Sequence, residues 1–306
     1  MVWKRVPGEM DSRKPRHGGS GVFSFTGYHI VRNHPVPELP DVESFKIYLR
    51  STSLRKRIVD VECREERVIK EMGANEFKAK LVGTAFQGVS RRGKFLIVEI
   101  AGIPEMLVFH FGMTGDLRYV EQGGEETGQD RFTRLVFKFE NGYELRWINV
   151  RKLGRVYLVK DLEKIPLLHE MGPEPLTLSE RAFARFLCKH GEKRLKAFFL
   201  DQRAIAGIGN VYSDEILFRA RLTPHRKVKT LSADERSQLY REMVGVLREA
   251  IRVRPPRGML FGALWLLPYR GGGMRCPRNG RHRLKRERVA GRTVVYCPVC
   301  QPDLHS

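Results

Sequence analysis

Apolar and polar residues follow two different periods along this chain, and the change falls near its middle. Between Asp41 and Leu54 apolar side chains recur at helical spacing, which predicts one leading helix. Six apolar runs then read as strands: IVDVEC, GTAFQGVS, KFLIVEI, MLVFHF, TRLVFKF and YELRWIN. Glycine, asparagine and acidic residues separate these runs, as turns require. One helix ahead of many strands predicts a β-sandwich or barrel up to about residue 160.

The second half of the chain is predicted to be helical. Residues 179–190, 193–201, 209–220 and 232–252 each carry apolar residues at helical spacing. The boundary between the halves is expected at the segment MGPEPLTLSE, because its prolines suit a linker and Ser179 suits a helix cap. The predicted fold class is therefore α+β with several domains.

The charge composition narrows the class of partner. The 306 residues include 56 Lys and Arg against 35 Asp and Glu, a formal net charge of +21. This excess predicts a polyanionic partner, with nucleic acid ahead of an anionic membrane. No apolar run reaches the ~18 residues of a membrane-spanning helix, so no membrane partner is expected. Residues 252–292 hold twelve basic residues and one acid, Glu287, which marks a separate cationic tail.

Residues 1–36 are predicted to be an N-terminal extension. Residues 1–35 carry glycines and basic residues without a sustained period, and they lack the apolar core of a secretory signal, so a disordered arm is expected. Alternatively, translation starts at Val36, because valine can be encoded by GTG, which bacteria also use as a start codon. Removal of the initiator methionine would then leave Pro37 first. The five cysteines do not resemble a disulfide framework, which favours a reducing cytoplasm.

The stretch VPELPDVE, from Val36 to Glu43, has two interpretations. In the first it is an ordinary helix start, because proline suits the first turn and acidic residues suit its positive end. In the second it is a nucleophile. A free α-amino group has a pKa of about 7.7 to 8.0, well below that of lysine, so a free Pro37 nitrogen could attack an electrophilic carbon and form an iminium. Glu38 could then move the protons.

Five motifs in order decide between these interpretations. They are PELPDVE, which contains Pro37; RRGKFLIVEI, which contains Lys94; HFGMTGDLR, which contains Met113; the linker GPEPL; and LKAFFLDQRAIAGIGNVYSDEILFRARLTPHR, with Asn210 at its centre. Together they resemble the formamidopyrimidine-DNA glycosylase family, bacterial base-excision repair enzymes related to endonuclease eight. The resemblance runs from Pro37 to Gln301.

The resemblance implies three modules that hold damaged double-stranded DNA between them. These are an N-terminal catalytic β-sandwich with a leading helix at 37–165, a helix-two-turn-helix DNA-binding domain at 172–255, and a zinc-finger-like β-hairpin at 268–302. Such enzymes take the damaged base out of the stack.

The resemblance also implies a catalytic set. Pro37 would attack the sugar C1′ as the base leaves, and Glu38 would protonate the ring oxygen of the sugar. Lys94 would contact a phosphate beside the lesion, whereas without the resemblance it would be a strand-end lysine in water. Asn210 lies in a tight turn into a helix, where backbone N–H groups suit a phosphate.

A second set would fill the gap left by the extruded nucleotide. Met113 and Arg151 match two of the family's three gap-filling residues, although Met113 alone would equally suit a core. The family's usual DPRRFG reads NVRKLG here, with Lys152 and Leu153 in its second half. Leu153 can act as a wedge but cannot stack as phenylalanine does, which leaves recognition of the opposite base open.

The tail resembles the family's zinc finger, which usually carries two CxxC pairs. Cys297 and Cys300 form an intact pair, but the first pair reads Cys276-Pro-Arg-Asn, and asparagine is a poor zinc ligand. Tetrahedral zinc takes four sulfur or nitrogen donors, so His282 is expected to be the fourth; the alternative is that the metal has been lost. Arg292 matches the hairpin-tip arginine that grips phosphates near the lesion.

The resemblance therefore implies a DNA glycosylase and AP lyase that removes 8-oxoguanine and formamidopyrimidines through a Schiff base and β,δ-elimination. Two alternatives remain: an enzyme for oxidised pyrimidines, like endonuclease eight, and a non-catalytic binder of damaged DNA in which the extension blocks Pro37. Residues 253–275 lack the polar loop pattern that helps some members hold 8-oxoguanine. A monomer in the bacterial cytoplasm, associated with the nucleoid, is expected.

Overall fold

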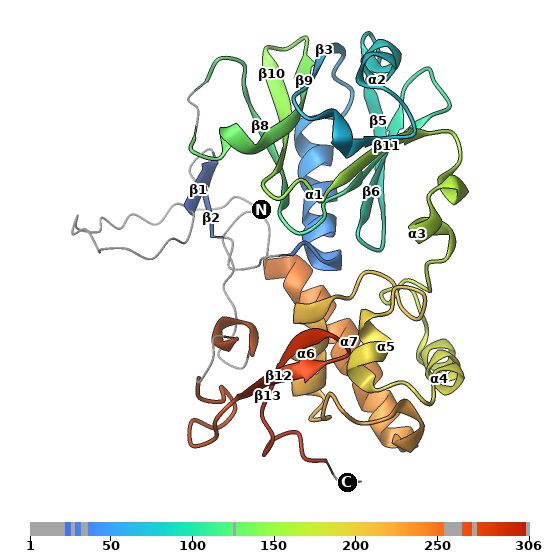
Figure 1. The fold of residues 1–306 in the computed structure, drawn as a ribbon, viewed down its shortest axis with the longest axis vertical. Helices are drawn as coiled ribbons and strands as arrows, with labels where there is room; N and C mark the ends of the chain where they lie inside the picture. Colours follow the sequence, from blue (N-terminus) through green and yellow to red (C-terminus); the bar gives the residue numbers. More distant parts are fainter. Residues whose placement is uncertain are drawn as a thin grey trace, which may run out of the picture.

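The computed structural model describes residues 22–25, 28–31, 36–124, 127–253, 265–270 and 274–303. In Figure 1 a β-rich part lies above a helical part, and the chain passes from the first to the second once. The disordered arm expected at 1–35 falls mostly outside the described residues. Its described part forms two short antiparallel strands, β1 (Val22–Phe25) and β2 (Tyr28–Val31), which the sequence pattern does not predict.

Two β-sheets make up the β-rich part. Their strands are β3 (Ile58–Cys63), β4 (Ile69–Lys70), β5 (Phe86–Arg92), β6 (Phe95–Ile100), β7 (Met106–His110), β8 (Gly115–Glu121), β9 (Thr133–Phe139), β10 (Tyr143–Asn149) and β11 (Arg155–Val159). One sheet has the order β3-β9-β10-β8 and the other β4-β11-β7-β6-β5. Neighbours are antiparallel except β4 and β11. The six predicted strands are all present.

The alternation of side chains explains how the central strands are buried on both faces. Leu96 and Val98 of β6 point into the core between the sheets, whereas Phe95 and Ile97 join a second cluster with Ile165, on the outer face of the five-stranded sheet. Burial on both faces is why β6 reads as a continuous apolar run. The leading helix α1 (Leu39–Thr52) and the short helix α2 (Ala74–Leu81) add side chains to the core between the sheets.

The helical part contains α4 (Glu180–Lys189), α5 (Leu195–Leu200), α6 (Asn210–Arg219) and α7 (Ala233–Val253), after the single-turn helix α3 (Pro166–His169). These four longer helices confirm the predicted ones to within two residues at each end. Ser179 caps α4 as expected, because its hydroxyl accepts the N–H of Ala182 at 3.3 Å. Among the described residues, no helix combines the length and apolar character that crossing a bilayer requires.

The two parts are joined by buried contacts at the start of α1. Leu39 belongs to the helical core, and its N–H donates to the carbonyl of Gly207 at 2.9 Å. Gly207 has φ +79°, and a Cβ there would collide with Leu39, so this approach requires glycine. Nearby, Arg91 bridges Glu43 of α1 and Glu174 of the linker, each at 2.8 Å. The head of α1 is therefore held against the head of α6.

A β-hairpin completes the fold and packs on α6. Its strands are β12 (Lys285–Val289) and β13 (Arg292–Tyr296), which lie beside α6 in Figure 1. Phe218 of α6 shares a small core with Leu266, Val295 and Cys297. The α+β fold class, with a β-sandwich, a helical domain and a terminal hairpin, is confirmed.

Glu215 of α6 anchors the segment that leads to the hairpin, and it should make stability depend on pH. Its buried carboxylate accepts the N–H groups of Leu266 and Leu267 at 2.8 and 3.1 Å, and burial raises its pKa from 4.5 to about 7 even though Arg219 opposes this. The folded state thus binds the proton more tightly. The free energy of unfolding should therefore fall by roughly 3 kcal/mol as pH rises from about 4.5 to about 7.

Glu215→Gln should flatten this dependence, because both amides bond to the same carboxylate oxygen, which the glutamine oxygen can replace, and glutamine has no proton to lose. Melting temperatures of both proteins at intervals between pH 5 and pH 8 measure the effect. Parallel curves for the two proteins would contradict the assignment.

Candidate active site and nucleic-acid interface

Glu38 is a fully buried carboxylate that lies directly before α1 and points at the first turn of α6. Its two oxygens accept the N–H groups of Gly209, Val211 and Tyr212 at 2.6, 2.8 and 3.3 Å. These groups have no partner within the helix, and the positive end of the helix dipole stabilises a negative charge beside them. Glu38 is therefore held as an anion that accepts hydrogen bonds at the start of α6, although it lies 171 positions before Gly209 in the chain.

Lys94 lies close to Glu38, beside the position where Gly209 lacks a Cβ. A Cβ on Gly209 would come within 2.7 Å of both Glu38 Oε1 and Lys94 Nζ, so only glycine leaves room for the two charged groups. Burial lowers the pKa of Lys94, the negative charge of Glu38 raises it, and the positive charge of Arg292 lowers it again. Glu38 and Arg292, which come from two different modules, therefore both act on Lys94.

Pro37 is buried immediately ahead of Glu38. In the chain as described its nitrogen is bonded to the carbonyl carbon of Val36. An amide nitrogen shares its lone pair with the carbonyl group and is not a nucleophile. The position beside Glu38 suits the predicted attack, but only a form in which Pro37 comes first could carry it out.

Asn210 is the first residue of α6, and a buried network that the sequence did not reveal holds its backbone. Lys196, fully buried in α5, donates to the carbonyl of Asn210 at 2.8 Å and to Ser213 Oγ at 2.7 Å, and it pairs with Asp214. Asp214 also pairs with Arg270 and accepts the N–H of Val295 at 3.1 Å. The network ties Asn210 to the hairpin. The sign of this network in the sequence was Lys196, which occupies an apolar position of the helical segment LKAFFL.

Asn210 itself has an unused polar atom. Its Oδ1 is buried and has no hydrogen-bond partner among the described residues. A buried polar atom left unpaired is costly, so its place at a helix start is consistent with a site that is completed by a ligand.

The predicted gap-filling residues come from two loops that touch. Arg151 Nη1 lies 3.2 Å from Met113 Sδ, and the N–H of Arg151 donates to Thr114 Oγ1 at 3.0 Å. Leu153 is half exposed, at 50% of its possible surface. The exposed Leu153 and Arg151 thus lie on the same projection as Met113.

Lys152 points elsewhere. It adopts φ 53°, and its ammonium pairs with Glu65 at 2.5 Å. The Arg67 and Lys152 side chains lower the pKa of Glu65 to about 2, so this pair stays charged at neutral pH.

Arg292 is exposed at the tip of the hairpin. The two residues before it, Ala290 and Gly291, have φ 51° and 73°, the left-handed conformations of a two-residue turn. The turn places Arg292 at the start of β13, where its positive charge lowers the pKa of Lys94. The hairpin therefore closes one side of the candidate site.

Four predicted metal ligands come together below this tip. The donor atoms of Cys276, His282, Cys297 and Cys300 lie within 4.8 Å of one another. The Sγ atoms of Cys276 and Cys300 are 3.8 Å apart, and His282 Nδ1 lies 3.3 Å from Cys300 and 3.8 Å from Cys297. Ligands about 2.0 to 2.3 Å from a tetrahedral zinc ion lie about 3.3 to 3.8 Å apart. The cluster could hold a metal ion, and its donor set fits zinc.

Asn279, which stands where the family's second cysteine is expected, shapes the turn that brings in His282. Its side chain accepts the N–H of Arg281 at 3.0 Å, and its carbonyl accepts the N–H of His282 at 2.9 Å. The N–H of Cys276 then donates to the carbonyl of His282 at 3.0 Å. The local backbone thus places an imidazole where a thiolate would be.

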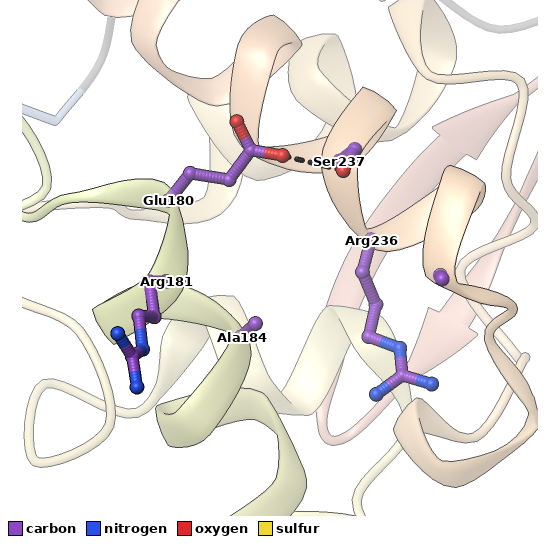
Figure 2. A pocket seen from close by; sticks show the side chains of 6 residues that line it. Glu180, Arg181, Ala184, Arg236 and Ser237 are labelled. Atoms are coloured by element: carbon purple, nitrogen blue, oxygen red, sulfur yellow. Dashed lines mark hydrogen bonds between the residues drawn. The ribbon is translucent and has the colours of Figure 1, made fainter.

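A groove of about 480 Å³ lies apart from these residues, between α4 and α7. Figure 2 shows Glu180 and Arg181 on one side facing Arg236 and Ser237 on the other, with a hydrogen bond between Glu180 and Ser237. None of the predicted site residues lines it.

Comparisons with known proteins agree with this geometry. A family model for the formamidopyrimidine-DNA glycosylase N-terminal domain matches residues 36–156, and one for the H2TH domain of the same enzymes matches residues 171–256. A formamidopyrimidine-DNA glycosylase of Thermus thermophilus is 37% identical over 283 residues, 88% of this chain and 99% of that protein. One from Pelotomaculum thermopropionicum is 34% identical over 281 residues, 87% of this chain and 99% of that protein.

Solved structures are similar as well. The Lactococcus lactis Fpg in complex with DNA containing an abasic site has a TM-score of 0.75 and 29% identity, over 87% of this chain and 100% of that one. The wild-type L. lactis protein bound to DNA containing N7-benzyl-Fapy-dG has the same TM-score and coverage at 30% identity.

Proposed function

Since this chain belongs to the formamidopyrimidine-DNA glycosylase family, we propose that it is a base-excision repair glycosylase with AP lyase activity that removes oxidised purines from duplex DNA. The observation that carries the proposal is the convergence of Glu38, Lys94 and the first turn of α6 around Gly209. The named relatives and the L. lactis complexes with damaged DNA support the substrate class.

The proposed chemistry starts at the Pro37 nitrogen, in a form whose first residue is Pro37. The nitrogen lone pair bonds to C1′, and the bond from C1′ to the damaged base breaks. The base leaves with the electron pair of that bond and takes up a proton from water. Glu38 takes the proton from the Pro37 nitrogen and passes it to the sugar ring oxygen, the ring opens, and an iminium joins Pro37 to C1′. The iminium makes the adjacent carbon acidic, so two successive eliminations release both flanking phosphates. Schiff-base chemistry of this kind is general to the family.

Three cations and one helix start would hold the DNA backbone. Lys94 is partly buried, so its charge loses part of its hydration, and a phosphate would offset that cost with a charge-assisted hydrogen bond. Asn210 presents the N-terminus of α6, and Arg292 reaches over from the hairpin. Met113, Arg151 and Leu153 would enter the gap left by the nucleotide, whereas Lys152 would reach the backbone only by leaving its ion pair with Glu65.

We further propose that Cys276, His282, Cys297 and Cys300 hold a zinc ion. Zinc would supply the cross-link that folds residues 274–303, whose own apolar cluster is limited to Val289, Val294 and Tyr296. Action as a monomer and a place at the nucleoid are part of the proposal, and the net charge of +21 supports the second.

Borohydride trapping tests the proposed reaction. The form that begins at Pro37 should give a covalent adduct with a duplex containing 8-oxoguanine, because borohydride reduces the iminium to a stable amine. Pro37→Gly should slow formation of the adduct about tenfold, since glycine offers a primary amine without the ring. Intact-mass analysis of natively expressed protein establishes which form the cell makes.

Two other results would change the conclusion. Faster trapping on an oxidised-pyrimidine duplex than on 8-oxoguanine would indicate the endonuclease-eight branch. Tight binding without any adduct on oxidised or abasic duplexes would leave a binder of damaged DNA and would contradict the proposed reaction.

A further inference from the structure

Glu287 is the one acid in the cationic tail at 252–292, and three side chains meet its carboxylate. His225 Nε2 bonds to its Oε1, and the Lys285 ammonium lies 2.8 Å from its Oε2. The Tyr296 side chain bonds to it as well. Burial raises the pKa of Glu287, but the bonds from Lys285, His225 and Tyr296 lower it to about 2. Because an ionised carboxylate only accepts hydrogen bonds, His225 Nε2 is the donor.

His225 ties the hairpin to a loop of the helical part. It lies between α6 and α7, 62 positions before Glu287. Its ring also meets the Tyr296 ring edge on, with the ring centroids 5.7 Å apart. The other strand of the hairpin is held separately, because the N–H of Val295 in β13 donates to Asp214 of α6 at 3.1 Å. The loop therefore holds β12, whereas α6 holds β13.

Glu287 and Arg292 lie on the same face of the hairpin, in neighbouring rows. The register pairs Glu287 with Val294 and Val289 with Arg292. Residues two apart in a strand share a face, and so do residues directly opposite each other. The turn between the strands has only two residues, so Arg292 cannot move far independently of β12. The Glu287 carboxylate therefore holds the hairpin one row below the tip.

We propose that Glu287 is a positioning residue: by binding His225 it docks the hairpin on the loop between α6 and α7, and it thereby holds Arg292 opposite Lys94. This inference rests on the proposed function, in which Arg292 helps to hold the DNA backbone. The His225 and Glu287 side chains are 30% and 24% exposed, and a partly exposed pair contributes little to folding. Loss of the pair should therefore leave the hairpin folded but less precisely placed.

Charge and position predict opposite effects when this carboxylate is removed. Glu287→Ala takes a negative charge away from a cationic surface, and this change by itself should strengthen binding to DNA. If the carboxylate positions Arg292, the same substitution should weaken binding. The sign of the change in affinity therefore separates the two explanations.

Binding titrations with a duplex that contains a tetrahydrofuran site test the proposal, with each variant in the form beginning at Pro37. Glu287→Ala should raise the Kd about fivefold, near the upper limit for a partly exposed pair. In an Arg292→Ala background the same substitution should not weaken binding further, because a residue that acts through Arg292 then has nothing to position.

Glu192→Ala is the matched control. Glu192 pairs with Lys227 and Lys229 of the same loop, at 3.0 and 2.6 Å, but it lies between α4 and α5 and not in the hairpin. Its replacement also removes one negative charge. The Kd of this variant should stay within about twofold of wild type.

Two outcomes would overturn the inference. One is a Kd for Glu287→Ala at or below that of wild type, and the other is an equal loss of affinity whether or not Arg292 is present. If Glu287→Ala does not fold, as judged by its melting curve, His225→Ala leaves the hairpin sequence intact and is subject to the same two outcomes. Absence of a borohydride adduct with the wild-type form would instead overturn the proposed function.

Discussion

Glu38→Gln is expected to lower the single-turnover rate of base excision by about 10³-fold. Part of the loss is the proton transfer to the sugar that the proposed reaction routes through this carboxylate. The rest is structural, because the carboxylate accepts three N–H groups at the head of α6. Glutamine has one acceptor oxygen, and its NH₂ group would face at least one of those donors without a bond.

The same change should shift the alkaline limb of the pH profile to lower pH. The negative charge of Glu38 raises the pKa of Lys94, which burial has lowered. With that charge removed, the pKa of Lys94 falls further, and the ammonium group loses its proton at a lower pH. Affinity for a duplex with a tetrahydrofuran site should then decline earlier as the pH rises.

Rapid-quench excision assays and a binding titration between pH 6 and pH 9 measure the two effects. Glu99→Gln is the control, because Glu99 is an exposed carboxylate on β6, the strand that follows Lys94. An excision rate for Glu38→Gln within about threefold of wild type would contradict the role assigned to Glu38.

Removal of the proposed zinc ion is expected to weaken binding to damaged duplex DNA by about 100-fold. A structural zinc ion contributes roughly 10 to 16 kcal/mol to the folding of small metal-binding modules, so the hairpin should not persist without it. Arg292 would then lose its position opposite Lys94, and β13 would no longer lie against Asp214. The salt dependence of binding should also become less steep, because fewer phosphates are neutralised.

Cys297→Ser is the substitution that tests this loss, since Cys297 is fully buried within the cluster. Cys188→Ser is the matched control, because Cys188 is an exposed cysteine outside the cluster. His282→Cys should retain the metal as a four-thiolate site, whereas His282→Ala should lose it. Elemental analysis should find about one zinc per wild-type chain, and a value below about 0.2 would contradict the ligand set.

Local sequence determined most of the elements of the fold. The strand IVDVEC and the helix from 232 to 252 could be predicted because a side-chain period of two or 3.6 residues is set by the backbone of the segment itself. β8 was missed because Arg118 occupies a buried position in it. Arg118 is tolerated there because its guanidinium forms an ion pair with Asp130 at 3.1 Å. Asp130 lies in a short 3-10 turn that follows the strand.

Motif spacing likewise determined the candidate residues, including His282 as a fourth ligand. What it left open was whether the imidazole reaches the three thiols. The hydrogen bonds of Asn279 and Cys276 close the turn that brings it there.

Only the tertiary structure decided which buried polar groups pair with one another. The bonds of Glu38 to α6, of Lys196 to Asn210, and of Asn149 to Phe111 join segments that are 14 to 174 positions apart. A period in the sequence says which face of an element is buried, but it carries no information about the distant donor or acceptor that meets that face. Because an unpaired buried polar group is costly, those partners are set by the packing of the whole chain.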